Sequence, residues 1–169
     1  MPLDASCPEA SGNEPGRHYL YPGTLFTHRE PHIVTTVLGS CVSVCLWDSA
    51  QRVGGINHYL LPLWNGEGLP TPKYGNIAIS KLIEKVQTLG AGTKLVAKVF
   101  GGASMWEKTD GLLAIGQRNI ELAFDLLEQH RIPVISRDVG GPVGRKIIFN
   151  TAEGTVLLKR QRALRPDGS

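Results

Sequence analysis

The sequence has no apolar run long enough to cross a lipid bilayer. A membrane-spanning helix needs about 20 consecutive apolar residues, and polar or charged residues interrupt every apolar stretch before that length. Residues 1–16 carry three acidic side chains and no apolar core, which is unlike a signal peptide. We therefore expect a cytoplasmic protein that does not insert into the membrane.

Cysteine is scarce, and the three cysteines do not form a regular framework. Cys7, Cys41 and Cys45 are odd in number, which is typical of a protein from a reducing compartment rather than a disulfide scaffold. A metal site made of Cys41, Cys45 and His58 would have only three ligands and lacks the paired cysteines of structural zinc sites. No phosphate-binding or dinucleotide-binding glycine motif is present. We expect no metal and no organic cofactor.

Strong charge of one sign is also missing, because the net charge is only +3. The one concentrated basic stretch, residues 159–165, lies beside the C-terminus and is typical of a solvated tail. A nucleic-acid-binding surface would need a basic stripe interleaved with aromatic residues, so no nucleic acid partner is expected.

The length of 169 residues suits one domain with one core. Residues 1–17 are rich in Pro, Ser, Gly and Glu and are expected to form a disordered leader. We expect the folded domain to span residues 18–160 and a flexible basic tail to span residues 161–169.

Hydrophobic periodicity predicts a strand-rich domain with two helices. Apolar residues recur at helical spacing over 79–89 and over 116–130, and each helix is followed by a residue that terminates it, Gly90 and Pro133 respectively. β-branched or alternating segments predict the strands, which are 33–38, 42–47, 53–61, 95–100, 134–138, 146–149 and 155–158. This order indicates an α/β fold, a three-layer sandwich with a mixed, largely antiparallel sheet and two main helices.

Cys41 is the first candidate for chemistry, because it follows Gly39 and Ser40 at the junction between two predicted strands. A thiol at such a turn can be reached by a substrate, and glycine allows backbone N–H groups to face a developing oxyanion. Gly39 and Ser40 are therefore candidate oxyanion residues. The alternative is that Cys41 is a small hydrophobic residue of a strand, and this is the better interpretation for Cys45, which lies mid-strand.

His58 is the best partner for Cys41 among the five histidines, since it lies in an otherwise apolar strand that could pair beside residues 42–47. A neighbouring histidine can favour the reactive thiolate. Thr35, on the preceding strand, offers a hydroxyl that could orient the imidazole. Alternatively, His58 could be a hydrogen-bonded core histidine.

Six blocks in the chain resemble the CheD family of chemoreceptor glutamine deamidases. These blocks are Thr35–Val42, Gly54–Pro62, Lys73–Asn76, Phe100–Met105, Ile115–Asn119 and Asp138–Gly141. Their order is more specific than any single block, and together they cover residues 18–160.

The resemblance implies a three-layer α/β sandwich in which Cys41 is the nucleophile, His58 the base and Thr35 the third member of the site. It implies that a protein-bound glutamine is converted to glutamate with release of ammonia, through a thioester on the cysteine and without a cofactor. The expected substrates are the cytoplasmic domains of chemotaxis receptors, and the resemblance also implies docking to a phosphatase of the CheC type. The alternatives are a receptor glutamate methylesterase and a non-catalytic docking module that regulates such a phosphatase.

Overall fold

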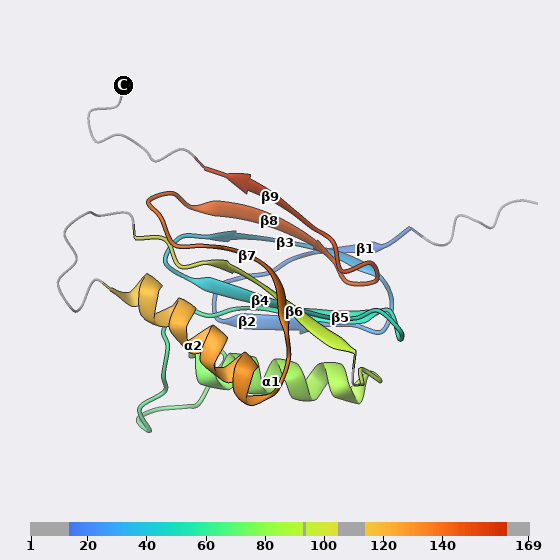
Figure 1. The fold of residues 1–169 in the computed structure, drawn as a ribbon, viewed down its shortest axis with the longest axis horizontal. Coiled ribbons are helices and arrows are strands. Elements are labelled where there is room, and N and C mark those ends of the chain that lie inside the picture. Colours follow the sequence, from blue (N-terminus) through green and yellow to red (C-terminus); the bar gives the residue numbers. More distant parts are fainter. Residues whose placement is uncertain (1–13, 93, 105–113, 162–169) are drawn as a thin grey trace, which may run out of the picture.

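Two stacked β-sheets and one layer of helices make up the fold (Figure 1). The computed structural model describes residues 14–92, 94–104 and 114–161. The strands are β1 Gly16–Tyr19, β2 Thr24–Thr27, β3 His32–Leu38, β4 Val42–Asp48, β5 Val53–His58, β6 Leu95–Gly101, β7 Val134–Val139, β8 Arg145–Asn150 and β9 Val156–Arg160. The helices are α1 Gly75–Thr88 and α2 Ile115–Gln129. Neither of these two helices is long and apolar enough to cross a membrane.

The strands divide between a four-stranded sheet in the order β1-β3-β8-β9 and a five-stranded sheet in the order β2-β5-β4-β6-β7. Each sheet is mixed and largely antiparallel, because β1 runs parallel to β3 and β7 runs parallel to β6 while the other pairs are antiparallel. The predicted layered α/β sandwich with two helices is confirmed. The predicted strands belong to two sheets rather than one.

Two separate cores hold the three layers together. The first lies between the helices and the five-stranded sheet, where α1 buries Ala78, Ile79, Leu82 and Val86 at helical spacing. The second lies between the two sheets. Its buried side chains are Leu20, Val34, Leu38, Cys45, Ile56, Phe100, Ile147 and Phe149. The inner strands β4 and β5 of the five-stranded sheet therefore bury both faces, and β5 has six buried residues in succession.

Two strands were not predicted from the sequence, β1 and β2. Each has only four residues, and β1 is mostly exposed, so neither carries a clear alternating pattern. β1 begins at Gly16, inside the segment expected to be a disordered leader. Residues 1–13 and 162–169, which hold most of the expected leader and tail, lie outside the described residues.

The connection between β3 and β4 carries the chain from the four-stranded sheet to the five-stranded sheet. It consists of residues 39–41, so Cys41 lies at the edge of the space between the two sheets, where the chain crosses from one to the other. The fold thus places the predicted nucleophile at a sheet-to-sheet crossing rather than within a ladder.

Candidate functional site

Backbone hydrogen bonds fix the turn that carries Cys41. The Gly102 N–H donates to the Cys41 carbonyl at 2.8 Å, and the Ala103 N–H donates to the Gly39 carbonyl at 2.9 Å. Gly101 and Gly102 both have positive φ, 108° and 73°, which favours glycine. A Cβ atom at Gly101 would also overlap the Cys41 carbonyl oxygen. The glycine pair at the end of β6 is therefore required for the backbone to approach the cysteine turn.

The Cys41 thiol is half-buried and packs against the core between the sheets. Burial raises the pKa of this thiol above its ordinary value, and a hydrogen bond from the Cys41 backbone N–H opposes that shift with a smaller effect. The resting side chain is consequently a neutral thiol at neutral pH. A base is needed to make it nucleophilic.

His58 is the last residue of β5 and is almost fully buried, with 2% of its surface exposed. Its Nδ1 atom lies 2.7 Å from Thr36 Oγ1, and the Thr36 hydroxyl donates to the Leu20 carbonyl at 2.8 Å. A hydroxyl has only one hydrogen, so Thr36 must accept from Nδ1–H of His58. This assigns the proton of the neutral imidazole to Nδ1 and leaves Nε2 as the basic atom.

Burial lowers the pKa of His58 from 6.5 to about 4. The imidazole is therefore neutral at physiological pH, which is the form that can accept a proton from a thiol.

The pairing of β4 with β5 brings Cys41 and His58 to neighbouring positions. Val42 pairs with Tyr59 and Cys45 pairs with Ile56, so this register sets Ser43 opposite His58 and places Cys41 diagonally across from it. Alternate residues of β4 share a face, and Cys41 and Cys45 both pack into the core between the sheets, as does Ile56 on the face of His58. Diagonal cross-strand neighbours lie about 7–8 Å apart, and no hydrogen bond joins Cys41 to His58 in this structure.

The structure does not bring Thr35 to the imidazole. Thr35 lines a hollow on the outer face of the four-stranded sheet together with Ile33, Val37 and Lys146. Successive residues of a strand point to opposite faces, so Thr36 is the threonine that turns inward, and it is fully buried. The hydroxyl that holds His58 therefore belongs to Thr36, one residue later than the sequence interpretation placed it.

Gly39 and Ser40 lie in the cysteine turn, as expected, and the Ser40 carbonyl accepts a hydrogen bond at 3.1 Å from Nδ2 of Asn119 on α2. No backbone N–H of residues 39–41 donates to another described residue. Sequence reasoning did not identify Asn119 as part of this region, because only the docking of α2 brings it there.

Cys45 and the potential metal ligands have other surroundings. Cys45 is buried between the sheets, and burial strongly raises its thiol pKa, so it is unreactive. Within the described ranges, no group of three or more His, Cys, Asp or Glu side chains is arranged to hold a metal ion. Cys7 lies outside the described residues.

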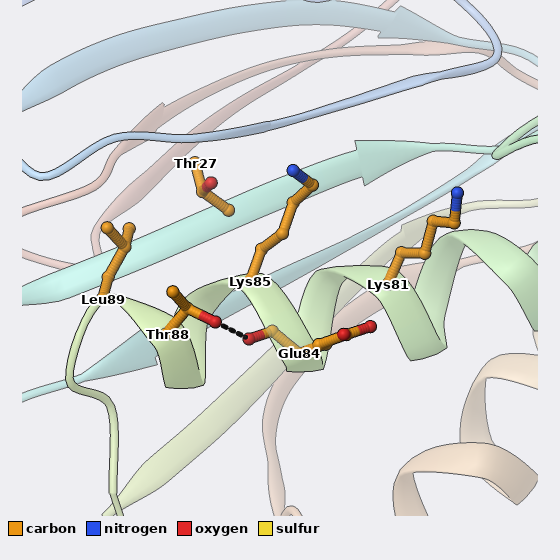
Figure 2. A pocket seen from close by; sticks show the side chains of 6 residues that line it. All are labelled: Thr27, Lys81, Glu84, Lys85, Thr88 and Leu89. Atoms are coloured by element: carbon orange, nitrogen blue, oxygen red, sulfur yellow. Dashed lines mark hydrogen bonds between the residues drawn. The ribbon is translucent and has the colours of Figure 1, made fainter.

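A separate hollow lies beside α1, against β2 (Figure 2). It contains no cysteine or histidine and shares no residue with the site around Cys41. Its lining residues are Thr27, Lys81, Glu84, Lys85, Thr88 and Leu89. It is not the candidate catalytic site.

The fold is an α/β sandwich, and its site combines a cysteine in a turn with a neutral histidine that is hydrogen-bonded to a threonine hydroxyl. Cysteine-dependent acyl transfer uses these two side chains, so fold and site define a class of protein suited to that chemistry. Comparison with known proteins then identifies the family. Residues 60–160 match the family model described as CheD chemotactic sensory transduction. The chain belongs to the CheD family.

Relatives from three bacteria extend this match over most of the chain. A protein of Trichlorobacter lovleyi, named "Probable chemoreceptor glutamine deamidase CheD", is 54% identical over 90% of this chain and 95% of its own length. A protein of Sulfurimonas denitrificans with the same name is 48% identical over 85% of this chain and 93% of its own. "Probable chemoreceptor glutamine deamidase CheD 1" of Anaeromyxobacter dehalogenans is 45% identical over 89% of this chain and 91% of its own.

Proposed function

We propose that this chain is a chemoreceptor glutamine deamidase, which converts specific glutamine side chains of chemotaxis receptors to glutamate. Family membership supports the reaction, since relatives that match nearly the full chain carry that name. The observation that carries the proposal is the position of Cys41 diagonally across from a neutral His58, at the edge of the space between the two sheets. The substrates would be the cytoplasmic domains of the receptors, with the protein itself in the cytoplasm.

In the first half of the reaction, Nε2 of His58 accepts the proton of the Cys41 thiol while the sulfur attacks the carbonyl carbon of the substrate carboxamide. The new C–S bond turns the carbonyl oxygen into an oxyanion, which a backbone N–H of the cysteine turn can stabilise. His58 then returns the proton to the nitrogen of the tetrahedral intermediate. The C–N bond breaks, ammonia leaves, and a thioester remains on Cys41.

In the second half, water attacks the thioester and His58 accepts one proton from it. Collapse of the second tetrahedral intermediate breaks the C–S bond, and the proton returns to the sulfur. The products are a glutamate side chain and the regenerated thiol. Thr36 acts here as a positioning residue, because its hydroxyl holds the proton of the imidazole on Nδ1 throughout.

A phosphatase of the CheC type is a second proposed partner, and docking to it need not use the catalytic groups. The Cys41→Ala variant separates the two roles, because it removes the sulfur without changing the backbone of the turn. We expect this variant to bind the phosphatase as tightly as the wild type does.

The test is peptide mass spectrometry of a chemoreceptor cytoplasmic domain co-expressed with the wild type, with Cys41→Ala or with Cys45→Ala. The expected result is conversion of particular glutamines to glutamate by the wild type and by Cys45→Ala, and none by Cys41→Ala. Cys45→Ala is the matched control, because it removes an equally small thiol that is buried away from the opening. Loss of methyl groups from methylated glutamates, without conversion of glutamine, would instead show that the chain is a receptor glutamate methylesterase. If none of several receptors tested is modified, the chain is a docking protein rather than an enzyme.

A further inference from the structure

Asn119 is a fully buried polar residue to which the mechanism above gives no role. It belongs to the Ile115–Asn119 block, which is part of the family resemblance but contains neither the nucleophile nor the base. Its Nδ2 atom donates to two backbone carbonyls, that of Ser40 at 3.1 Å and that of Leu60 at 2.9 Å. One side chain therefore connects the residue before Cys41 with the residue two positions after His58.

Close packing of α2 against the loop after β6 makes this double contact possible. Gly116 lies one turn before Asn119, and a Cβ atom there would lie 2.6 Å from the Gly102 carbonyl oxygen and 2.7 Å from that of Ala103. The Tyr59 hydroxyl donates to the backbone carbonyl of Asn119 at 2.6 Å. The helix backbone is thus held independently of the Asn119 amide, which is left to act on the cysteine turn.

The bond to Ser40 determines where the Cys41 N–H points. A peptide unit is planar and trans, so its C=O and N–H point in opposite directions. Because the Ser40 carbonyl is directed at Asn119, the Cys41 N–H is directed away from Asn119, and it belongs to the residue that carries the sulfur. When a carbonyl carbon bonds to that sulfur, its oxygen develops negative charge beside the same N–H.

The bond to Leu60 fixes the second strand relative to the first. Leu60 directly follows Tyr59, which forms an isolated bridge with Val42. Leu60 therefore lies beyond the regular pairing between β4 and β5. A donor shared between Ser40 and Leu60 therefore holds the end of the histidine strand against the start of the cysteine strand. The Oδ1 atom of Asn119 is buried and has no hydrogen-bond partner among the described residues, so its two Nδ2 donors make the side-chain contacts that connect it to the cysteine turn and to Leu60.

From these contacts we propose that Asn119 is a positioning residue for deamidation, which orients the Cys41 N–H as an oxyanion donor and holds Cys41 in register with His58. The inference rests on the proposed function for its catalytic readout. It assigns a task to the Ile115–Asn119 block through atoms that do not touch the substrate.

The test compares Asn119→Ala and Asn119→Asp with Tyr59→Phe, using a receptor cytoplasmic domain as substrate well below each unfolding temperature. Removing one oxyanion donor lowers kcat by about 100- to 1000-fold. A donor that is only misdirected is expected to lower kcat by at least about tenfold, with KM nearly unchanged. Alkylation of Cys41 by iodoacetamide forms no oxyanion, so its rate should fall far less than kcat. In Asn119→Asp, kcat should recover partly as the pH falls, because a protonated carboxyl can donate one hydrogen bond to Ser40.

Tyr59→Phe is the matched control, because it removes a hydrogen bond to the same residue of α2 and leaves the Nδ2 donors in place. We expect it to lower the unfolding temperature and to keep kcat. Wild-type kcat in Asn119→Ala, or losses in Asn119→Ala and Tyr59→Phe that simply follow their stabilities, would overturn the inference.

A second readout does not depend on deamidation. The backbone amide resonance of Cys41 in NMR spectra should shift more in Asn119→Ala than in Tyr59→Phe, because only the first variant frees the Ser40–Cys41 peptide. If the wild type modifies no receptor, the proposed function fails while the amide resonance still decides on Asn119. An unchanged Cys41 resonance in Asn119→Ala would refute the positioning role in either case.

Discussion

The buried imidazole of His58 predicts a specific loss of stability in mild acid. Burial lowers its pKa from 6.5 to about 4 in the folded state, whereas in the unfolded chain the pKa returns to its ordinary value. The folded state therefore binds the proton less readily. The stabilising contribution of neutral His58 is complete above about pH 6.5 and is lost as the pH falls through the interval down to about pH 4.

The size of this loss follows from the difference between the two pKa values. One pKa unit corresponds to 1.36 kcal/mol, so a difference of about 2.5 units makes about 3 kcal/mol between pH 7 and pH 4. This is a large part of the free energy of unfolding of a typical domain. Desolvation alone lowers the pKa, so the effect should persist at high salt.

Urea unfolding of the wild type and of His58→Gln, measured at intervals from pH 7 to pH 4, tests this reasoning. Acidic residues whose pKa values are also lowered, Asp48 and Asp138, are present in both proteins, so their effect cancels in the difference. The stability of the wild type relative to the variant should fall by about 3 kcal/mol over this range. Parallel pH profiles for the two proteins, or a His58 ring resonance that titrates near its ordinary pKa, would refute the argument.

Two further predictions concern the hydroxyl groups around the imidazole. Thr36→Val should lower kcat for deamidation by about tenfold or more, because the Nδ1 proton of His58 loses its acceptor. Thr35→Val, on the outer face, should keep kcat within about twofold of wild type. Equal losses of kcat in steady-state assays of the two variants would contradict the assignment to Thr36. The buried hydroxyl of Ser43 has no hydrogen-bond partner in the part of the chain that the structure describes, so Ser43→Ala should raise the free energy of unfolding by about 1 kcal/mol, or Tm by about 2–4 °C in calorimetry. A decrease in Tm would show that this hydroxyl is hydrogen-bonded in solution.

Much of the fold could be predicted from the sequence, because its longer elements bury regular apolar patterns. Both helices and the strands from β3 onward carry helical spacing or β-branched runs, and they occur where predicted within a few residues. The division into two sheets could not be predicted, because β3 and β4 are adjacent in sequence and yet pair in different sheets. Strand pairing is decided by contacts distant in sequence, which a local pattern does not contain.

The site shows the same limit at the level of single residues. Cys41 and His58 could be selected because a turn and an apolar strand set them apart from the other cysteines and histidines. The choice between Thr35 and Thr36 could not be made from the pattern, since Ile33 and Val37 on one face are as apolar as the neighbours on the other. The hydrogen bond from His58 to Thr36 decides between them.

The environment of the two proposed catalytic groups favours neutral partners at rest. Burial raises the thiol pKa of Cys41 and lowers the imidazole pKa of His58, so desolvation opposes a resting thiolate–imidazolium pair from both sides. In the proposed mechanism, proton transfer to Nε2 is then coupled to attack on the substrate, because the oxyanion that develops beside the Cys41 N–H compensates the new positive charge on the ring. The imidazolium therefore forms when the tetrahedral intermediate forms, and at that stage the departing nitrogen needs a proton. A pair that ionises only with substrate in place suits an amide, whose leaving group cannot depart without general acid help.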